Sequence, residues 1–291
     1  MQVKEQTVIW LQGAGCSGCS VSIMNSVSPT IRNLLLDEIV PGKHISFVFH
    51  PTLMAASGEL SIEVMLAKSK GTGYLLVLEG AIPTAKNGVF ATVGEEKGEP
   101  VTVYSRFKEL SQNALCIIAL GTCAAFGGIP AAKPNPTGSK SAMEVLKEEN
   151  IKVPCINIPG CPPHPDWFVA TVADIILNGV PSSEKLDELK RPKLIYGRLI
   201  HENCPRRPFF DEGKFARNFG EEGCLYELGC KGPFTYADCP NRLWNGGVNW
   251  VIGAGSPCLG CVEPIFPDVS GPFYKKISSW EKFKLQLEKE N

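Results

Sequence analysis

The segment Val8–Cys19, VIWLQGAGCSGC, decides the fold because it joins an apolar strand to a glycine-rich turn and then to a helix. Its first residues, Val8–Leu11, are apolar without alternation, which is typical of a strand that is covered on both faces. Two cysteines, Cys16 and Cys19, lie in the turn that follows. The segment therefore predicts a strand–turn–helix unit of a parallel sheet, with two thiols at the turn.

The first 180 residues repeat this alternation of strands and helices. Buried strands are expected at Val8–Leu11, Ile45–Phe49, Tyr74–Leu78, Leu115–Leu120 and Val153–Ile158. Helical patterns are expected at Ser20–Ile39, Glu59–Lys68, Ser105–Gln112, Ser141–Glu149 and Asp166–Leu177. Such an alternation predicts an α/β domain, in which a parallel sheet has helices on both faces.

The turn also matches the G-x-G-x-x-G pattern of dinucleotide-binding proteins, at Gly13–Gly18. That pattern requires an acidic residue near the end of the next strand, where it binds the ribose. Here the strand ends in Phe49, His50 and Pro51, without an acid. Two cysteines inside the loop also argue against a nucleotide. The glycines are better explained by a close approach of the backbone to an inorganic cluster.

Ten of the twelve cysteines and one histidine form three sets of the size that metal sites need. The first set is Cys16, Cys19, Cys123 and Cys161. The second set is His201, Cys204, Cys224 and Cys230. The third set is Cys239, Cys258 and Cys261. Cys116 and Cys155 remain, and we expect both to be small buried apolar residues inside strands.

The cysteines of the first set follow the first, fourth and fifth predicted strands. Because ligands of parallel α/β sheets bind beyond the carboxyl ends of the strands, these four thiols are expected at one sheet edge. Glu79 follows the third strand, at the same edge. We consider two roles for it, a proton relay and an acid that caps backbone N–H groups.

Disulfides and zinc are the alternatives to iron–sulfur clusters. Disulfide-rich chains are usually small and poor in apolar core, unlike this one. Structural zinc sites usually pair two CxxC units, whereas here most ligands are single and distant. Three of them precede proline, namely Cys161, Cys204 and Cys239. Distant cysteines of this kind are more typical of iron–sulfur clusters, although zinc in one site stays an alternative.

Composition describes an ordinary globular protein of 291 residues, with 44% hydrophobic residues and 29 basic against 30 acidic side chains. No basic excess indicates nucleic-acid binding. No apolar run is long enough for a transmembrane segment. No signal peptide is visible before the first strand, which predicts a cytoplasmic protein, or a periplasmic one if an export signal has been removed.

A polar connector, Pro181–Pro192, separates two regions that differ in composition and periodicity. We expect a first domain over residues 1–180 and a second over residues 181–291. The second is rich in Gly, Pro and Cys and lacks long periodic segments, so it needs metal sites to stabilise its small core. The second and third ligand sets lie there.

Motifs along nearly the whole chain resemble the small subunit of nickel–iron hydrogenases. They are Val8–Cys19, Glu79–Pro83 (EGAIP), Gly121–Ala124 (GTCA), Pro159–Pro163 (PGCPP), His201–Pro205 (HENCP), Gly229–Pro233 (GCKGP), Ala237–Pro240 (ADCP) and Cys258–Pro264 (CLGCVEP). Two further segments, Cys19–Val21 and Trp244–Trp250 (WNGGVNW), resemble the nickel–iron–selenium branch.

The resemblance implies a flavodoxin-like first domain and three clusters in a line. The first set would bind a proximal 4Fe–4S cluster, the second a distal 4Fe–4S cluster and the third a medial cluster. In several selenium-branch relatives a fourth medial cysteine stands where this chain has Val251, which favours a 3Fe–4S cluster here. Oxygen-tolerant relatives have extra cysteines at the positions of Gly18 and Gly128, so an ordinary proximal cubane is expected.

The resemblance also implies a place in a larger enzyme. A separate large subunit would hold the nickel–iron centre that oxidises dihydrogen or reduces protons, and no nickel ligands remain in this chain. The two chains would form a heterodimer, which can pair again. Electrons would leave to an external carrier such as a cytochrome or a ferredoxin, and this chain alone would be inactive. The alternative is an iron–sulfur subunit of another oxidoreductase.

Overall fold

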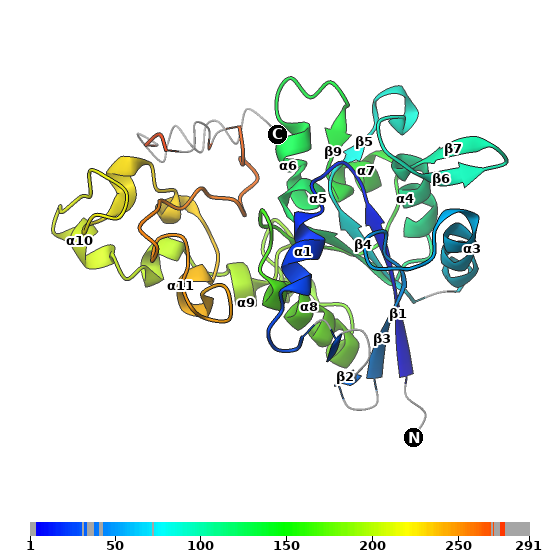
Figure 1. Ribbon diagram of the computed structural model, residues 1–291, viewed down its shortest axis with the longest axis horizontal. Helices are drawn as coiled ribbons and strands as arrows, with labels where there is room; N and C mark the ends of the chain where they lie inside the picture. Colours follow the sequence, from blue (N-terminus) through cyan, green and yellow to red (C-terminus); the bar gives the residue numbers. More distant parts are fainter. Residues whose placement is uncertain are drawn as a thin grey trace. The chain divides into compact units, whose positions relative to one another are not determined.

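The apolar runs form the strands of one sheet in the computed structural model, which describes residues 4–30, 32–33, 38–40, 43–71, 73–268, 270 and 274–276 (Figure 1). The sheet has the order β10-β8-β4-β1-β3-β2. Its parallel strands are β1 (Lys4–Gln12), β3 (Lys43–Phe49), β4 (Leu75–Glu79), β8 (Cys116–Leu120) and β10 (Cys155–Ile158). A short strand, β2 (Glu38–Val40), pairs antiparallel at one edge. All five predicted strands are confirmed, and their order is that of flavodoxin-like folds.

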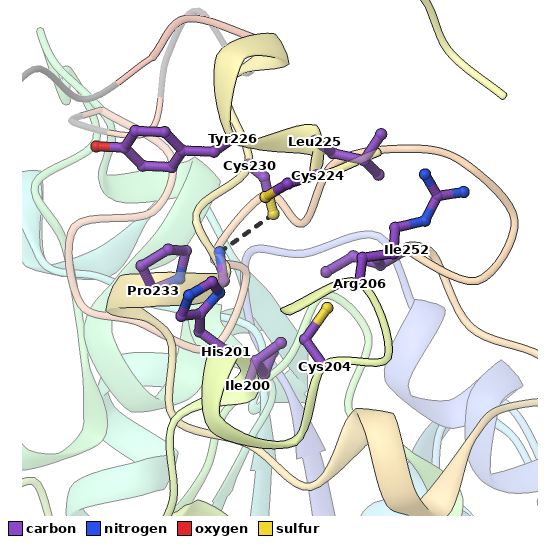
Figure 2. Close-up of a pocket in the computed structure, with 11 residues that line it drawn as sticks. Ile200, His201, Cys204, Arg206, Cys224, Leu225, Tyr226, Cys230, Pro233 and Ile252 are labelled. Carbon is purple, nitrogen blue, oxygen red and sulfur yellow. Dashed lines mark hydrogen bonds between the residues drawn. The ribbon is translucent and has the colours of Figure 1, made fainter. Parts of the chain in front are cut away.

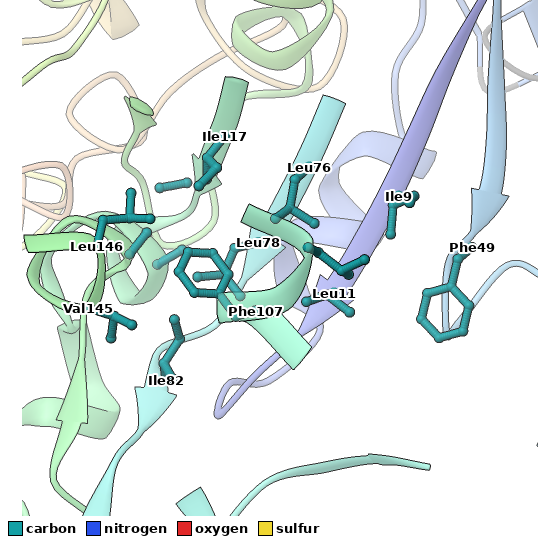
Figure 3. Close-up of a cluster of buried hydrophobic side chains, with 14 of the residues drawn as sticks. Ile9, Leu11, Phe49, Leu76, Leu78, Ile82, Phe107, Ile117, Val145 and Leu146 are labelled. Carbon is teal, nitrogen blue, oxygen red and sulfur yellow. The ribbon is translucent and has the colours of Figure 1, made fainter. Parts of the chain in front are cut away.

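Helices cover both faces of this sheet. One face packs against α3 (Gly58–Ser69), α4 (Val103–Ser111) and α7 (Ala142–Glu148), whose apolar side chains join those of the strands in one cluster (Figure 3). On the other face lie α1 (Gly18–Met24) and α8 (Pro165–Asn178). Consecutive residues of β1 face opposite sides of the sheet. Ile9 belongs to the first cluster, whereas Trp10 packs on Phe168 of α8, with ring centroids 5.5 Å apart. Burial on both faces explains the apolar runs without alternation.

Four of the five predicted helices, α3, α4, α7 and α8, are confirmed with ends that differ by at most two residues. The fifth, predicted over Ser20–Ile39, is wrong in its length. Helix α1 ends at Met24, and Ile39 lies in β2. A continuous helix is also incompatible with Pro29, whose ring disfavours helical backbone at the preceding residue. Residues 31 and 34–37 of this prediction lie outside the described residues.

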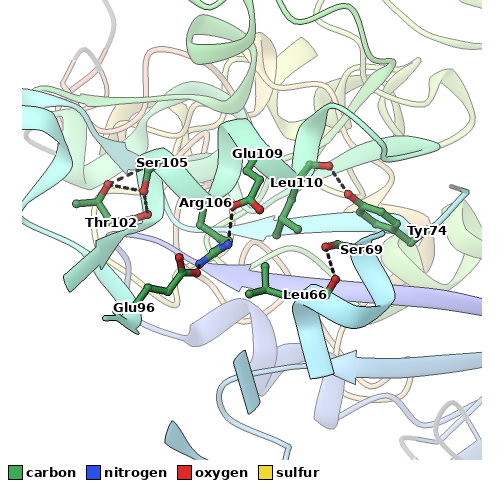
Figure 4. Close-up of polar contacts among 9 residues, drawn as sticks. All are labelled: Leu66, Ser69, Tyr74, Glu96, Thr102, Ser105, Arg106, Glu109 and Leu110. Atoms are coloured by element: carbon green, nitrogen blue, oxygen red, sulfur yellow. Dashed lines mark hydrogen bonds and ion pairs between the residues drawn. The ribbon is translucent and has the colours of Figure 1, made fainter. Parts of the chain in front are cut away.

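Polar contacts attach α4 to a hairpin that the sequence did not predict. Strands β6 (Thr92–Glu96) and β7 (Glu99–Thr102) form this hairpin. The hydroxyl of Thr102 accepts a hydrogen bond from the backbone N–H of Ser105 at 3.1 Å and so caps α4 (Figure 4). The buried guanidinium of Arg106 bridges Glu96 and Glu109. The remaining short elements of this unit are β5 (Ile82–Pro83), η1 (Ala85–Gly88), α5 (Thr122–Phe126), α6 (Gly128–Ala131), β9 (Ser139–Lys140) and η2 (Ser183–Lys185).

The chain divides into two compact units, Met1–Pro192 and Lys193–Asn291. In the described part of the second unit, regular structure is limited to short helices and isolated bridges. The helices are α9 (Lys193–Tyr196), η3 (Ile200–Asn203), α10 (Arg207–Asp211), η4 (Leu225–Leu228), η5 (Gly232–Phe234) and α11 (Cys239–Arg242). This unit is loop-rich, as expected. Among the residues described in both units, no helix has the length and apolar character needed to cross a bilayer.

Candidate functional site

The four thiols of the first set lie at the carboxyl edge of the sheet. Cys16 lies between β1 and α1, and Cys19 is in the first turn of α1. Cys123 is in α5, directly after β8, and Cys161 follows β10. Burial, the Glu79 carboxylate and the other three thiols together raise the pKa of Cys19 well above its usual value. The structure therefore brings these thiols within electrostatic reach of one another, from four separate positions in the chain.

Two glycines keep the space around these thiols free. Gly121 precedes α5 with a φ of 86°, and a Cβ atom there would lie 2.5 Å from the sulfur of Cys19. Gly128 has a φ of 51°, and its Cβ atom would lie 2.9 Å from the backbone of Cys123. Both backbone conformations favour glycine, and any side chain would collide with Cys19 or Cys123. The close approach therefore depends on glycine at both positions.

Glu79 is a buried acid that holds the first turn of α1. Its carboxylate accepts hydrogen bonds from the backbone N–H of Ser20 at 3.0 Å and from the Ser20 hydroxyl. The side chains of Trp10 and Gln12 each donate a further bond at 3.0 Å. Four donors satisfy the carboxylate, and an acid at a helix N-terminus is favoured by the helix dipole. These contacts favour the capping role over the proton relay, which stays a prediction.

His50 is a member of this edge that sequence reasoning missed. Its ring is 2% exposed and packs on Trp10, with centroids 4.5 Å apart. The Nε2 atom lies 3.5 Å from the Ser20 hydroxyl, and Nδ1 lies 3.3 Å from the backbone N–H of Thr52. Burial lowers the pKa of His50 to about 4, so the ring is neutral near pH 7. The sequence offered one signal for His50, namely its position directly after the second strand. A nucleotide-binding protein would have an acidic residue there.

The second set lines one cavity in the second unit. Its walls carry His201, Cys204, Cys224 and Cys230 together with apolar side chains such as Ile200 (Figure 2). Burial raises the pKa of Cys230 to about 11, and the backbone N–H of Gly232 lies 3.4 Å from its sulfur. Burial and the Arg207 charge lower the pKa of His201, which favours the neutral imidazole that a metal ligand requires.

The third set lies in the same unit. Cys239 begins α11, and Cys258 and Cys261 are in the loop that follows. Burial, followed by the charge of Cys261, raises the pKa of Cys239 to about 12. The backbone N–H of Gly260 lies 3.4 Å from the Cys258 sulfur, which suits a sulfur that carries negative charge. In the described part of the chain, no three His, Cys, Asp or Glu side chains are close enough to share a single metal ion.

The leftover cysteines occupy neighbouring strands of the sheet. Cys116 of β8 is fully buried, and Cys155 of β10 is half-buried. Burial raises the pKa of each thiol to about 12, so both stay neutral and act as small apolar residues. His164, which follows the first set's last cysteine closely, accepts a hydrogen bond from the N–H of Asp166 at 3.1 Å and caps α8.

Comparison with known proteins found a family match in each unit. Residues 16–175 match the family described as NADH ubiquinone oxidoreductase, 20 Kd subunit. Residues 196–274 match the family that describes the C-terminal part of the NiFe/NiFeSe hydrogenase small subunit. The periplasmic [NiFeSe] hydrogenase small subunit of Desulfomicrobium baculatum is 47% identical, over 93% of this chain and 87% of that protein. The chain belongs to the nickel–iron hydrogenase small subunits.

Other relatives agree with this membership. The periplasmic [NiFe] hydrogenase small subunit of Solidesulfovibrio fructosivorans is 44% identical, over 93% of this chain and 82% of that protein. The reduced, active Ni-Fe-Se hydrogenase structure from Desulfomicrobium baculatum superposes with a TM-score of 0.88 at 46% identity, over 94% of this chain and 100% of that chain. The small subunit is the electron-transfer partner of a hydrogenase large subunit, and its family carries iron–sulfur clusters. These predictions are confirmed.

The comparisons contradict the prediction of a cytoplasmic hydrogenase subunit. The relatives from Desulfomicrobium baculatum, Solidesulfovibrio fructosivorans and Nitratidesulfovibrio vulgaris are all named periplasmic. The cytoplasmic prediction was wrong because it relied on the first residues alone.

Proposed function

We propose that this chain carries electrons through three iron–sulfur clusters, between the nickel–iron centre of its large subunit and an external carrier. The observation that carries the proposal is the cavity on which His201, Cys204, Cys224 and Cys230 converge. Thiolates with one imidazole are ligands that iron–sulfur clusters accept. The clusters supply one-electron transfer when bound, and the chain binds them, orients them and keeps water away.

The proximal 4Fe–4S cluster is assigned to Cys16, Cys19, Cys123 and Cys161. Support comes from the common sheet edge of these thiols and from the free space that Gly121 maintains beside them. Burial alone would keep such thiols protonated. Iron reverses this preference because ligation requires the thiolate and the metal charge stabilises it.

The distal 4Fe–4S cluster is assigned to the second set and a medial 3Fe–4S cluster to the third. Three sulfur ligands fit three irons, and a fourth ligand is missing from the position that follows Trp250. Val251 stands there, with a side chain that is 41% exposed and has no atom able to bind iron. We assign the proximal cluster to a domain of residues 1–180 and the other two to a domain of residues 181–291.

Electrons leave through the distal cluster, where His201 is half-buried. The neutral imidazole replaces a thiolate and raises the reduction potential of the cluster. Exposed charged side chains beside it, Glu202 and Arg207, suit a cytochrome or a ferredoxin as the carrier. Arg206 has a structural role. It donates hydrogen bonds to the carbonyl oxygens of Glu221 and Gly223 at 2.7 and 2.8 Å and so holds the loop before Cys224.

Purification of the complete hydrogenase tests the cluster assignment. Metal and sulfide analysis of the complex should find about twelve irons and no zinc, of which about eleven belong to the two four-iron clusters and one three-iron cluster of this chain and one to the nickel–iron centre. Electron paramagnetic resonance of the oxidised enzyme should show the three-iron signal. Zinc that stays bound after dialysis against a chelator, or a complex with fewer than three clusters, would contradict the assignment.

A further inference from the structure

A buried lysine lies in the second unit. The Lys231 side chain is 2% exposed, although lysine is almost never fully buried without partners. Its Nζ atom donates to the carbonyl oxygens of Gly229 and Lys275, both at 2.6 Å. An ammonium group has three donors and no acceptor, so carbonyl oxygens suit it. None of the ligand roles assigned above uses this cation.

Lys231 contacts the loops of both ligand sets of this unit. It follows Cys230 directly, and its backbone N–H donates to the carbonyl oxygen of Cys258 at 2.8 Å. A Cβ atom on Gly260 would lie 3.3 Å from the Cβ atom of Lys231, so the lysine stem packs against the loop between Cys258 and Cys261. Lys231 is therefore adjacent in sequence to a thiol residue of the second set and hydrogen-bonded to a thiol residue of the third.

We propose that the Lys231 ammonium raises the reduction potentials of both the distal and the medial cluster. The inference rests on the proposed function, because it requires clusters at both sets. Reduction adds one negative charge to a cluster, and a nearby cation stabilises that reduced state. Burial removes the water that would screen this attraction. Since one cation acts on both clusters, the two potentials move in the same direction.

Redox titration of the complete hydrogenase, followed by electron paramagnetic resonance, tests this role. Lys231→Met and Lys231→Gln remove the charge, whereas Lys231→Arg retains it. Lys214→Met is the matched control, because it removes a lysine charge from the same unit where the side chain is 67% exposed. Iron content is measured on every variant. We expect both midpoint potentials to become more negative in the Met and Gln variants and to stay near wild type in the Arg and control variants.

Each outcome decides the proposal. Uncharged variants with full iron content and unchanged potentials would overturn it, and so would an equal shift in the Lys214→Met control. If neither uncharged variant assembles clusters while Lys231→Arg does, the charge serves assembly rather than the potentials, and the proposal is also overturned. Failure of the proposed function can be told apart from failure of the Lys231 role, because the wild-type complex itself would then lack one of the two cluster signals.

Discussion

The carboxylate of Glu79 accepts hydrogen bonds from both the backbone N–H and the hydroxyl of Ser20, the residue that follows Cys19. Fifty-nine residues of sequence separate the two partners. The contact ties the end of β4 to the first turn of α1. Strand β4, which contains no cysteine, therefore positions the helical turn that contains Cys19.

Replacement of Glu79 by glutamine tests this positioning. The new amide group would face donors on Trp10, Gln12 and Ser20, so at least one buried donor would lose its acceptor, at a cost of about 1–3 kcal/mol. We expect lower thermal stability of the complex and lower occupancy of the proximal cluster, measured by calorimetry and iron analysis. Glu59→Gln, on the exposed side of α3, is the matched control. Equal behaviour of the two variants would show that the contact does not position the ligands.

Val251→Cys tests the medial assignment. A thiolate after Trp250 could bind a fourth iron, and a four-iron cluster in this place should have a lower potential because cluster type sets potential. We expect the oxidised three-iron signal to disappear in the variant. Val248→Cys adds a thiol before Trp250 instead of after it, at a side chain that is 78% exposed, and should keep the signal. Absence of that signal from the wild-type enzyme would refute the three-iron assignment.

His201→Gly tests the electron exit. Loss of the imidazole should slow dihydrogen oxidation with an external acceptor by more than about tenfold, since loss of the groups that merely orient metal ligands already costs about ten- to a hundredfold. Hydrogen–deuterium exchange depends on the nickel–iron centre of the large subunit, so it should change little. Both rates are measured on the same preparation. A parallel fall of the two would indicate that His201 only supports the structure.

Removal of iron should unfold the second unit and spare the first. The described helices of residues 193–291 are at most five residues long, so ligation supplies much of their folding free energy. The first unit has a sheet with helices on both faces. Limited proteolysis of the iron-free chain should cleave beyond residue 193 and leave a protected N-terminal fragment. Uniform protection of both units would contradict this coupling.

The isolated small subunit should not oxidise dihydrogen. Once the three sets are assigned, only Cys116 and Cys155 remain as thiols, and both are neutral residues within the sheet. Hydrogen uptake with a dye acceptor, measured on a monomeric preparation, should be at background and should return on addition of the large subunit. Sustained turnover by the monomer would contradict the assignment of catalysis to the large subunit and of electron transfer to this chain.

The sequence alone determined the sheet and the meeting of its thiols. Runs such as Ile117–Leu120 are apolar on both faces, and a parallel sheet between helices is the arrangement that buries them. Since the carboxyl ends of parallel strands share one edge, Cys19, Cys123 and Cys161 had to converge. The predicted helix over Ser20–Ile39 is wrong in its length, because Pro29 disfavours helical backbone inside a segment that is otherwise periodic.

Only the tertiary structure decided what surrounds the ligands. The hydrogen bonds of Glu79, the contact between His50 and Ser20 and the burial of Lys231 all join residues that are distant in sequence. The sequence positions of charged and histidine side chains show no periodicity from which their contact partners could be predicted. Their roles follow from packing, because the position of each group depends on backbone segments that meet only when the chain has folded.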